Sequence, residues 1–321
     1  MRVLVVGGAG YIGSHAARAL RRSGLDVLIY DNLSTGFDFL AKGFEMVVGD
    51  IQDGDKLSQA LKQTDAVMHF AAHAYVGESV VNPRKYYRNN LEGGLALLNT
   101  MIDSGRSLPI IFSSTCAVYG VPKKMPLTED HPLAPINPYG VSKFFFEQAL
   151  ESYDTAYGLK SARLRYFNAA GADENGETGE YHDPEPHLIP LALRAATGAG
   201  ELQVFGDDYP TPDGTCIRDY INVDDLAEAH VIALQHLQAG NPSFTVNLGT
   251  GQGTSVKEVI YAVEEATGRK VPTKIVPRRA GDPPALVADP TQAQQLLRWR
   301  ARRPLKDSVA TAWKWMQQHG K

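Results

Sequence analysis

Short apolar runs and segments with helical spacing alternate along the first half of the chain. Six short segments, most of them apolar, predict strands, and they lie at residues 3–6, 26–30, 44–48, 66–70, 108–112 and 161–166. The spacing of apolar residues at 12–20 and 86–101 predicts helices, and a further helix is expected to begin after Pro138. This alternation of strand and helix predicts an α/β fold built on a doubly wound parallel sheet, the Rossmann arrangement.

The pattern changes beyond residue 170. Residues 171–186 hold Gly, Asp, Glu, His and Pro without a period, which predicts a loop or lid leading into a second region. Residues 223–237 then have helical spacing, and the apolar run at 244–248 predicts a strand that returns to the first region. We therefore expect a smaller C-terminal α/β region that is interleaved with the first and not simply appended to it.

Two more helices are expected toward the C-terminus. Ser255 and Glu258 have the spacing of a capping box, which predicts the start of one helix. An apolar-periodic helix that carries Trp313 and Trp315 is expected after Pro304.

The first predicted strand runs directly into a glycine-rich turn. Residues 7–13 read Gly-Gly-Ala-Gly-Tyr-Ile-Gly, and a helix is predicted to follow at once. Strand, glycine turn and helix form the context that a dinucleotide-binding fingerprint requires, whether its glycines are counted from Gly7 or from Gly8. Small residues there let the backbone approach a pyrophosphate at the positive end of the helix.

An acidic residue ends the second predicted strand. Asp31 stands about 20 residues beyond the glycines, where a carboxylate can accept hydrogen bonds from the ribose hydroxyls of an adenosine. Its charge would repel a 2′-phosphate, so we expect NAD as the cofactor and not NADP. Asp50 and Ile51 could flank the adenine, and the small residues at 71–74 leave room for the cofactor.

Candidate catalytic side chains come from the fifth predicted strand and the helix after it. Residues 113–115 read Ser-Ser-Thr and follow that strand, and ligands bind at the carboxyl ends of strands in open α/β sheets. Tyr139 and Lys143 are four residues apart, so they share one face of the predicted helix. A tyrosine, a lysine and a strand-end hydroxyl are the groups needed for proton transfer at a carbinol.

The proposed base is a tyrosine, whose free pKa near 10 is too high for a base at neutral pH. A Lys143 ammonium and a positively charged nicotinamide would both favour the Tyr139 phenolate, so we expect a lowered pKa at Tyr139. Thr115 would orient the same substrate oxygen. Hydride could then pass to NAD and return to the opposite face of a bound keto intermediate, although these residues alone also allow simple dehydrogenation.

Arginines in the second region predict a site for an anion. Arg218 and Arg279 lie in segments that contain glycine or proline, and the planar guanidinium fork suits phosphate oxygens. Two such segments could clamp one diphosphate. The alternative is a pair of surface ion pairs in which Asp219 and Asp282 are the partners.

Composition and charge narrow the class of protein. The chain has 321 residues, a formal net charge of −4 and no long basic run, so nucleic acid is not expected as a partner. No apolar run approaches membrane-spanning length, and the first residues do not have the pattern of a signal peptide. Cys116 and Cys216 stand far apart, which fits a reducing compartment, and we expect a cytoplasmic protein. His182 and His187 lack a third ligand at a matching spacing, so no metal site is expected.

Several stretches resemble the extended short-chain dehydrogenase/reductase family. They are the glycine turn, Ser-Ser-Thr-Cys-Ala-Val-Tyr-Gly at 113–120, the pair Tyr139 and Lys143, and Arg-Tyr-Phe-Asn at 165–168. Further stretches closely resemble the UDP-glucose (galactose) 4-epimerases of that family. They are Val-Gly-Glu-Ser at 76–79, Phe-Gly-Asp-Asp-Tyr-Pro-Thr at 205–211 and Arg-Asp-Tyr at 218–220.

The resemblance extends from residue 1 to the C-terminal region and implies an isomerase. Its expected reaction is the NAD-dependent interconversion of UDP-galactose and UDP-glucose through a transient 4-keto sugar, in a homodimer. It also implies an NAD-binding domain at 1–168, to which residues 222–248 return, and a UDP-sugar-binding region at 169–321.

The resemblance assigns roles to individual residues. Tyr139 is the expected base, Lys143 its partner, and Thr115 stands at a position often held by serine. The expected cofactor-binding residues are Gly7, Gly10, Tyr11, Ile12, Asp31, Asn32, Asp50, Ile51, Phe70, Ala71, Ala72, Asn90, Ser113, Tyr139, Lys143 and Tyr166. The expected substrate-binding residues are Thr115, Tyr139, Asn168, His187, Leu188, Gln203, Phe205, Arg218, Tyr220, Arg279 and Asp282.

Three residues depart from the family pattern and leave the sugar preference open. Ala74 replaces a lysine that some members place near the cofactor phosphates, and His187 replaces an asparagine of the sugar-nucleotide pocket. Leu286 stands where some members have tyrosine. A UDP-pentose (xylose/arabinose) or UDP-N-acetylhexosamine 4-epimerase is therefore an alternative.

Two other functions are disfavoured. A nucleotide-sugar 4,6-dehydratase usually has an Asp-Glu pair after the strand-end threonine, but Cys116 and Ala117 stand here. A non-catalytic NAD-sensing protein would not need Tyr139, Lys143 and Thr115 together.

Overall fold

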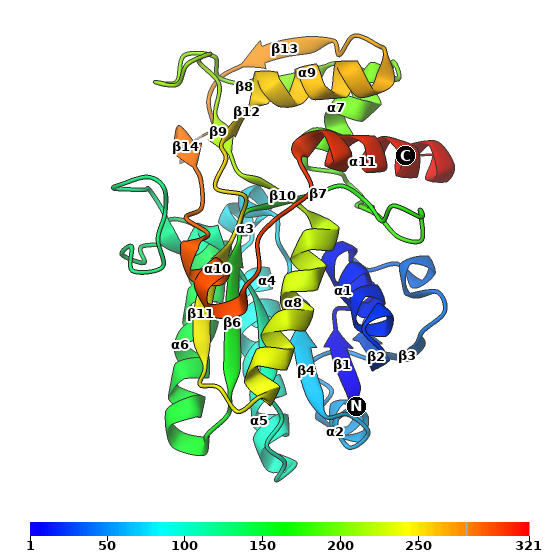
Figure 1. Cartoon of the computed structure of the whole chain (residues 1–321), viewed down its shortest axis with the longest axis vertical. Helices are drawn as coiled ribbons and strands as arrows, with labels where there is room; N and C mark the ends of the chain where they lie inside the picture. The colour runs from blue at the N-terminus through cyan, green and yellow to red at the C-terminus, as the bar shows by residue number, and fades with distance from the viewer. Residues whose placement is uncertain (280–281, 321) are drawn as a thin grey trace.

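The computed structural model describes residues 1–279 and 282–320, and a seven-stranded parallel sheet forms the lower part of the molecule in Figure 1. Its strands are β1 (Arg2–Val6), β2 (Asp26–Asp31), β3 (Glu45–Val48), β4 (Ala66–His69), β5 (Ile110–Thr115), β6 (Ser161–Tyr166) and β11 (Phe244–Leu248). Their order is β11-β6-β5-β4-β1-β2-β3. The predicted doubly wound sheet is thus confirmed. The order reverses between β1 and β4, the point at which such sheets bind ligands.

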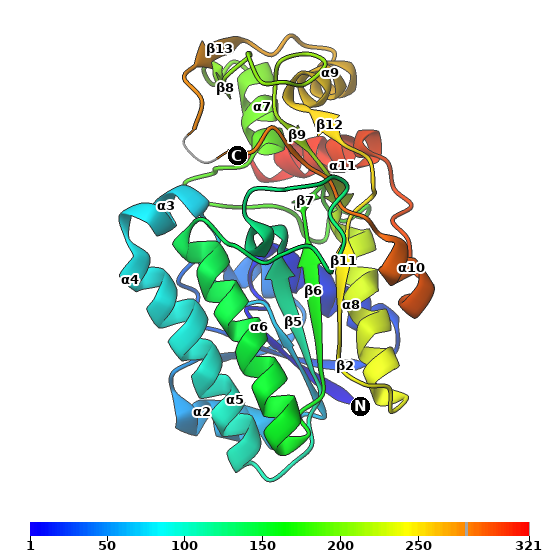
Figure 2. The same ribbon diagram turned by 90° about the vertical axis from the view of Figure 1, so that its left-hand side faces the viewer.

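Helices cover both faces of this sheet. The elements packed with it are α1 (Tyr11–Arg22), α2 (Gly54–Leu61), α3 (Val76–Val81), α4 (Pro83–Tyr86), α5 (Gly93–Asp103), α6 (Pro138–Tyr157), α8 (Val223–Gln238) and α10 (Thr291–Leu297). Figure 2 shows α5 and α6 side by side on one face, and α8 lies against α1 on the other. Two short 3-10 turns, η1 (Asp38–Ala41) and η3 (Cys116–Tyr119), complete this part.

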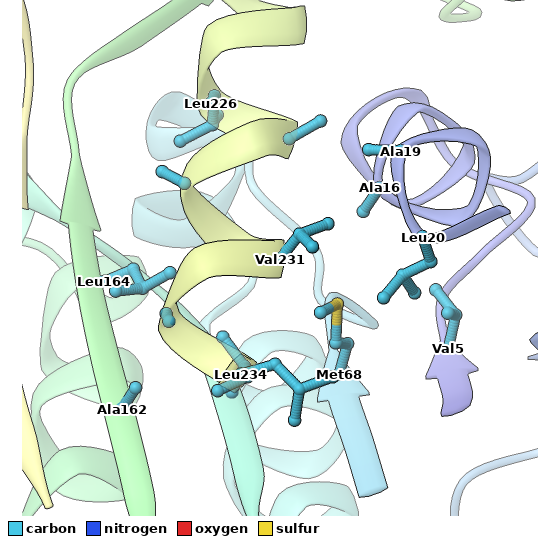
Figure 3. Close-up of a cluster of buried hydrophobic side chains, with 14 of the residues drawn as sticks. Val5, Ala16, Ala19, Leu20, Met68, Ala162, Leu164, Leu226, Val231 and Leu234 are labelled. Carbon is cyan, nitrogen blue, oxygen red and sulfur yellow. The ribbon is translucent and has the colours of Figure 1, made fainter. Parts of the chain in front are cut away.

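Alternate residues of each strand point into two separate cores. Val3 and Val5 of β1 pack with α1 and α8, as the close-up of Val5, Leu20 and Val231 shows (Figure 3). Leu4 and Val6 point the other way, toward α2, α5 and α6. Because both faces of its centre are buried, β1 carries apolar residues at all positions from Val3 to Val6, which is the pattern from which it was predicted.

A second region stands above the carboxyl ends of the strands (Figure 1). Its helices are α7 (Leu188–Ala196), α9 (Val256–Thr267) and α11 (Leu305–His319), which share a core of Ile189, Leu193, Val259, Val263 and Val309. Its strands are β7 (Asn168–Ala170), β8 (Leu202–Phe205), β9 (Ile217–Arg218), β10 (Tyr220–Asn222), β12 (Thr254–Ser255), β13 (Thr273–Val276) and β14 (Ala285–Leu286). Since α8 and β11 return to the large sheet from within this region, the expected interleaving is confirmed.

The predicted helix starts and loops agree with the structure in most places. The capping box of Ser255 and Glu258 is formed at the start of α9, and residues 171–186 hold one isolated bridge but no helix. Within residues 1–279 and 282–320, no helix is long and apolar enough to cross a membrane.

The helix expected at 86–101 is confirmed, but part of it is a π-helical turn that the sequence pattern did not indicate. The chain there forms α4, then the π-helical turn η2 (Tyr87–Glu92), then α5. The wider turn turns the Asn90 amide inward, where its Nδ2 donates to His73 O at 3.0 Å and to Ser142 Oγ at 3.1 Å. Apolar periodicity does not report this contact, because a π-helical turn inserts a residue without changing the residue types around it.

A buried ion pair lies under the strand that carries the hydroxyl cluster. Arg165 on β6 donates from Nε to the Glu147 carboxylate of α6 at 3.0 Å, and the Ser114 hydroxyl donates to the same carboxylate. All three side chains are almost fully buried. The pair therefore holds α6, β5 and β6 in register below the candidate catalytic residues.

Breaking this pair should destabilise the fold. Replacing Arg165 by methionine leaves the Glu147 charge buried without its partner, so we expect the free energy of unfolding to fall by about 3–5 kcal/mol. Urea unfolding followed by circular dichroism measures the loss. The control is Arg106→Met, because Arg106 pairs with Asp65 at the surface and such pairs contribute about 0–1 kcal/mol. Equal losses in the two variants would contradict the expectation.

Candidate active site

The start of α6 is fixed by its sequence, and this places Tyr139. The Asn137 side chain caps the helix by accepting a hydrogen bond from Gly140 N at 2.9 Å, and Pro138 occupies the first helical position. Ser142 Oγ donates to the backbone oxygen of Tyr139 at 2.7 Å, and Ser142 in turn accepts from Asn90. The first turn of α6 is thus tied to the π-helical turn.

Tyr139 and Thr115 are brought together as predicted. Thr115 is the last residue of β5, and its Oγ1 accepts a hydrogen bond from Ala117 N at 3.1 Å. The Thr115 side chain is also hydrogen-bonded to the Tyr139 hydroxyl. Two hydroxyls from different elements therefore point to one place at the carboxyl end of the sheet.

Lys143 lies on the same face of α6, and its side chain is buried. Its Nζ donates to Ser113 O at 2.8 Å and lies 4.9 Å from the centre of the Phe112 ring. Burial lowers the pKa of Lys143 to about 7, although the Glu147 carboxylate acts in the opposite direction. The ammonium is therefore held by one carbonyl and is only partly charged at neutral pH.

The expectation that Lys143 lowers the pKa of Tyr139 is wrong for the chain on its own. Burial raises the pKa of Tyr139 to about 12, the bond from Thr115 opposes this rise, and Lys143 has no part in it. The physical reason is that Lys143 points to Ser113 O, and that burial disfavours both the phenolate and the ammonium.

A second hydroxyl pair lies beside the first. Ser113 Oγ is hydrogen-bonded to the Tyr166 hydroxyl, and both side chains are buried. Burial and the neighbouring Tyr139 raise the pKa of Tyr166 well above its ordinary value. Tyr166 is thus a neutral hydrogen-bonding group next to the catalytic candidates.

The glycine turn is built by close backbone contacts. Gly7 has φ +82°, and a Cβ there would lie 2.4 Å from Ala71 N. A Cβ on Gly13 would lie 2.2 Å from Gly7 O, whereas Gly10 is the N-cap residue of α1 and has no side-chain cap. The reading from Gly7 therefore fits the geometry, with Gly10 at the helix terminus that would face a pyrophosphate.

The two acidic residues predicted to bind the adenosine part of NAD differ in burial and in their hydrogen bonds. Asp31 is buried and accepts hydrogen bonds from Ala9 N at 2.9 Å and Leu33 N at 2.8 Å. Burial raises the pKa of Asp31 and these two bonds oppose the rise. Asp50 is exposed, and its carboxylate accepts from the Asn32 side chain at 2.9 Å. Asp31 therefore supports the turn and still stands at the carboxyl end of β2.

Other predicted cofactor-binding residues pack against, or are hydrogen-bonded to, other parts of the chain. Ile51 is buried in the core beside Gly93, and Phe70 packs against the His230 ring at 4.9 Å. The Tyr11 hydroxyl donates to Gly171 O at 2.6 Å, and Ile12 packs at the edge of one core. Ala71 and Ala72 follow β4, where Ala71 contacts the glycine turn.

The substrate candidates form two groups in the second region. In the first, Asn168 and Tyr220 are opposite each other on the paired strands β7 and β10 and are hydrogen-bonded through their side chains. Arg218 donates to Pro283 O at 3.0 Å and lies 3.5 Å from the Asp282 carboxylate. Asp282 was one of the ion-pair partners expected in the alternative.

The alternative expectation that Asp219 forms a surface ion pair is wrong. This residue is fully buried and accepts hydrogen bonds from Thr250 N at 2.9 Å and Gly251 N at 3.0 Å. Asp219 lies between β9 and β10, and its carboxylate is occupied by these backbone donors and by the Thr250 hydroxyl, not by the Arg218 guanidinium.

The second group gathers at β8 and its continuation. The Arg279 guanidinium lies 3.8 Å from the centre of the Phe205 ring, and Gln203 is an exposed residue of the same strand. Neighbouring Arg278 instead pairs with Asp208 at 2.6 Å. Leu188 is the first residue of α7 and packs on the second core.

His187 lies in a cluster that sequence spacing missed. Its Nδ1 lies 2.8 Å from the Glu180 carboxylate and 2.9 Å from that of Glu185, and His182 lies 3.3 Å from Glu185. Burial would lower the pKa of His187, but Glu180 and Glu185 raise it to about 10. The premise that no third ligand matches the two histidines is therefore wrong, since the glutamates were not counted as ligands.

Residues 3–249 match the sequence profile described as "NAD dependent epimerase/dehydratase family". The chain is also 49% identical to the UDP-glucose 4-epimerase of Lactobacillus helveticus, over 100% of this chain and 98% of that protein.

Solved structures agree with this over nearly the whole chain. The UDP-glucose 4-epimerase of Brucella ovis in complex with NAD is 51% identical with a TM-score of 0.95, covering 98% of this chain and 97% of that one. The Stenotrophomonas maltophila UDP-glucose-4-epimerase with bound NAD and formylated UDP-arabinopyranose is 43% identical with a TM-score of 0.95. That match covers 100% of this chain and 99% of the other.

Proposed function

The chain belongs to the NAD-dependent epimerase/dehydratase family, and from that premise we propose how its residues carry out the reaction. The chain is an isomerase that interconverts UDP-galactose and UDP-glucose by 4-epimerisation, with NAD as its cofactor. The observation that supports the assignment of the site is the hydrogen-bonded pair of Thr115 and Tyr139 beside buried Lys143. It lies at the carboxyl end of β5, next to β4 at the point where the strand order reverses.

When bound, oxidised NAD supplies the hydride acceptor and a positive charge that favours the Tyr139 phenolate. Tyr139 accepts the proton of the C4 hydroxyl and returns it when the sugar is reduced again. Thr115 holds the same oxygen through its hydroxyl, which already bonds Tyr139. The hydrogen bond to Ser113 O holds the Lys143 ammonium in place. The hydrogen bonds of Asn90 and Ser142 hold the first turn of α6.

We propose that the two groups of the second region hold the UDP moiety. Arg218 and Arg279 would bind the diphosphate, because a guanidinium offers paired donors to phosphate oxygens. Asp282, close to Arg218, would accept from a ribose hydroxyl, and the Phe205 ring would lie against the uracil. Asn168, Tyr220, Gln203, His187 and Leu188 complete the proposed substrate-binding set. The adenosine and pyrophosphate of NAD would lie along Gly7, Gly10 and Asp31.

The substrate assignment is tested by product analysis. Purified protein is incubated without added NAD with UDP-galactose, UDP-xylose, UDP-arabinose and UDP-N-acetylglucosamine, and the products are separated by chromatography. We expect UDP-galactose to give UDP-glucose at the highest kcat/KM. Turnover of the pentoses alone would overturn the assignment to a hexose.

A UDP-pentose 4-epimerase activity is the second candidate. The observation that favours it is the Stenotrophomonas maltophila structure, in which a protein 43% identical to this chain binds formylated UDP-arabinopyranose. A pentose lacks the C6 hydroxymethyl, so it needs less space in the sugar pocket than a hexose does.

Removing one of the proposed UDP ligands should weaken binding. The Arg279→Ala variant is expected to raise the Kd for UDP about 10-fold, because a charge-assisted hydrogen bond contributes about 1.5–3 kcal/mol. Isothermal titration with UDP measures the change. The control is the adjacent Arg278→Ala, since Arg278 is engaged with Asp208 and the Tyr209 ring. If Arg278→Ala weakened binding as much as Arg279→Ala, the assignment would be refuted.

We also propose that the two regions of the chain bind different ligands. Residues 1–168 with 222–248 would bind NAD, since the glycine turn and Asp31 lie there, and residues 169–321 would bind the UDP-sugar. Limited proteolysis with and without each ligand would test it. If UDP protected only residues 1–168, the division would be wrong.

Location and assembly are further proposals. A cytoplasmic location is supported by Cys116 and Cys216, which are both buried free thiols. A homodimer is supported by exposed apolar side chains on the neighbouring helices α3 and α6, including Val81 and Phe145. Light scattering should give twice the mass of one chain, and a monomer would refute the proposed dimer. Cell fractionation should place the protein in the cytoplasm, and a secreted protein would refute the proposed location.

A further inference from the structure

Four side chains with metal-binding donor atoms meet where the loop of residues 171–186 runs into α7. They are Glu180, His182, Glu185 and His187, and one ligand atom from each lies within 4.8 Å of the others. The pairs with the shortest separations are His187 Nδ1 with Glu180 at 2.8 Å and with Glu185 at 2.9 Å. His182 Nδ1 lies 3.3 Å from Glu185 and 3.5 Å from Glu180.

We propose that these four side chains form a binding site for one zinc ion. Two imidazole nitrogens and two carboxylate oxygens are a donor set that Zn²⁺ accepts in tetrahedral geometry. Metal–ligand distances of about 2.0–2.2 Å place neighbouring tetrahedral ligand atoms about 3.4 Å apart. The four histidine–carboxylate separations of 2.8 to 3.5 Å are close to that value. All four ligand atoms lie within 4.8 Å of one another, so the side chains would move closer together to admit an ion.

The charge balance of the cluster favours a divalent cation. The Glu180 and Glu185 side chains are only 6% and 7% exposed, and buried carboxylates need partners. Among the described residues, neither carboxylate has a lysine or arginine partner, and both are paired with histidine. A zinc ion would displace the proton that His187 holds between the two carboxylates, because a metal ligand must be a neutral imidazole. The two carboxylates of the metal-bound cluster then carry a charge of −2, which one Zn²⁺ neutralises.

The surrounding structure holds the ligands in place before any ion arrives. His187 N donates to Glu185 Oε1 at 2.9 Å, and Trp315 Nε1 donates to Glu180 O at 2.9 Å. The Tyr75 hydroxyl donates to Pro184 O at 3.3 Å. A small cavity that Glu180, His182, Glu185 and His319 help to line adjoins the cluster. Such supporting contacts are typical of metal sites.

The proposed ion would fasten the loop between two parts of the molecule. The loop lies along α1, where Ser14 and Thr178 are hydrogen-bonded at 2.7 Å and Arg18 donates to Glu177 O at 2.9 Å. Its far end leads into α7, the first helix of the second region. The ion would therefore be structural, because four protein ligands fill a tetrahedral shell. The His187 side chain would then bind the ion in place of the substrate role proposed above.

The first test measures the metal content of the full chain. The protein is prepared without a histidine tag and dialysed against metal-free buffer. Plasma mass spectrometry should find about one zinc per chain, and added Co²⁺ should give the visible absorption of a tetrahedral nitrogen and oxygen site. Chelation with EDTA should lower Tm. A wild-type chain that contains no zinc and gives no tetrahedral Co²⁺ spectrum would overturn the proposal.

Two near-isosteric variants test whether the zinc ion binds at this cluster. Glu185→Gln and His182→Asn should each weaken zinc binding by at least about 100-fold, while His131→Asn and Glu45→Gln, which lie outside the cluster, should not. Circular dichroism of each variant checks that it is folded. Zinc retained by both cluster variants would place the ion elsewhere and refute the site. These readouts do not depend on epimerase activity, so they stand or fall separately from the proposed function.

Discussion

Replacing Tyr139 by phenylalanine is expected to lower kcat about 1,000-fold, because general acid–base catalysis contributes roughly 10²–10⁴-fold. The change removes only the hydroxyl that bonds Thr115, while the ring keeps its edge contact with Tyr86 at 6.5 Å between centroids. KM and the binding of UDP should change little, since the hydroxyl acts on C4 and not on the nucleotide. Steady-state kinetics with UDP-galactose and titration with UDP measure the two effects.

The matched control is Tyr157→Phe. Tyr157 is an exposed residue at the other end of the same helix, so its loss should leave kcat within about twofold of the wild type, as surface changes usually do. If Tyr139→Phe kept more than about a tenth of the wild-type kcat, Tyr139 would not be the base.

Features that depend on residue type and local spacing were predictable. The central strands β1 and β4 are buried on both faces, so their sequences are short runs of mostly apolar residues. The glycine turn was identifiable because it stands between an apolar run and a helical pattern. The choice between Gly7 and Gly8 needed the structure, in which Gly7 has a positive φ and contacts Ala71. Tyr139 and Lys143 share a helix face whose start is marked by Asn137 and Pro138.

Features that depend on long-range contacts were not predictable from the sequence. The Asn90 amide meets Ser142 across two elements, and nothing local to either residue indicates it. The direction of the pKa shift at Tyr139 was also missed, because it follows from the depth of burial and from where Lys143 points. The glutamates beside His182 and His187 become ligand candidates only after the loop has folded back on itself.

Replacing Lys143 by methionine should raise stability and remove activity together. Burial lowers the pKa of Lys143 from 10.5 to about 7, so the folded chain disfavours the ammonium, at about 1.4 kcal/mol per pKa unit. Methionine removes this cost, but it leaves Ser113 O without its donor, a loss of about 1–3 kcal/mol. We expect Tm to rise by about 3 °C at pH 7 and kcat to fall at least about 100-fold.

The pH dependence distinguishes this cause from simple repacking. Because the folded pKa of Lys143 lies below the unfolded value, the wild type takes up a proton on unfolding between about pH 7 and 10.5. Its stability penalty is full below pH 7 and disappears above pH 10.5. The difference in Tm between Lys143→Met and wild type, both stripped of NAD, should therefore fall as pH rises and become negative near pH 10.5, where only the loss of the donor to Ser113 O remains. The exposed control Lys124→Met should show a small difference that does not change with pH. A Lys143→Met difference that stayed constant from pH 7 to 10 would mean that packing, and not the buried charge, sets the stability at this position.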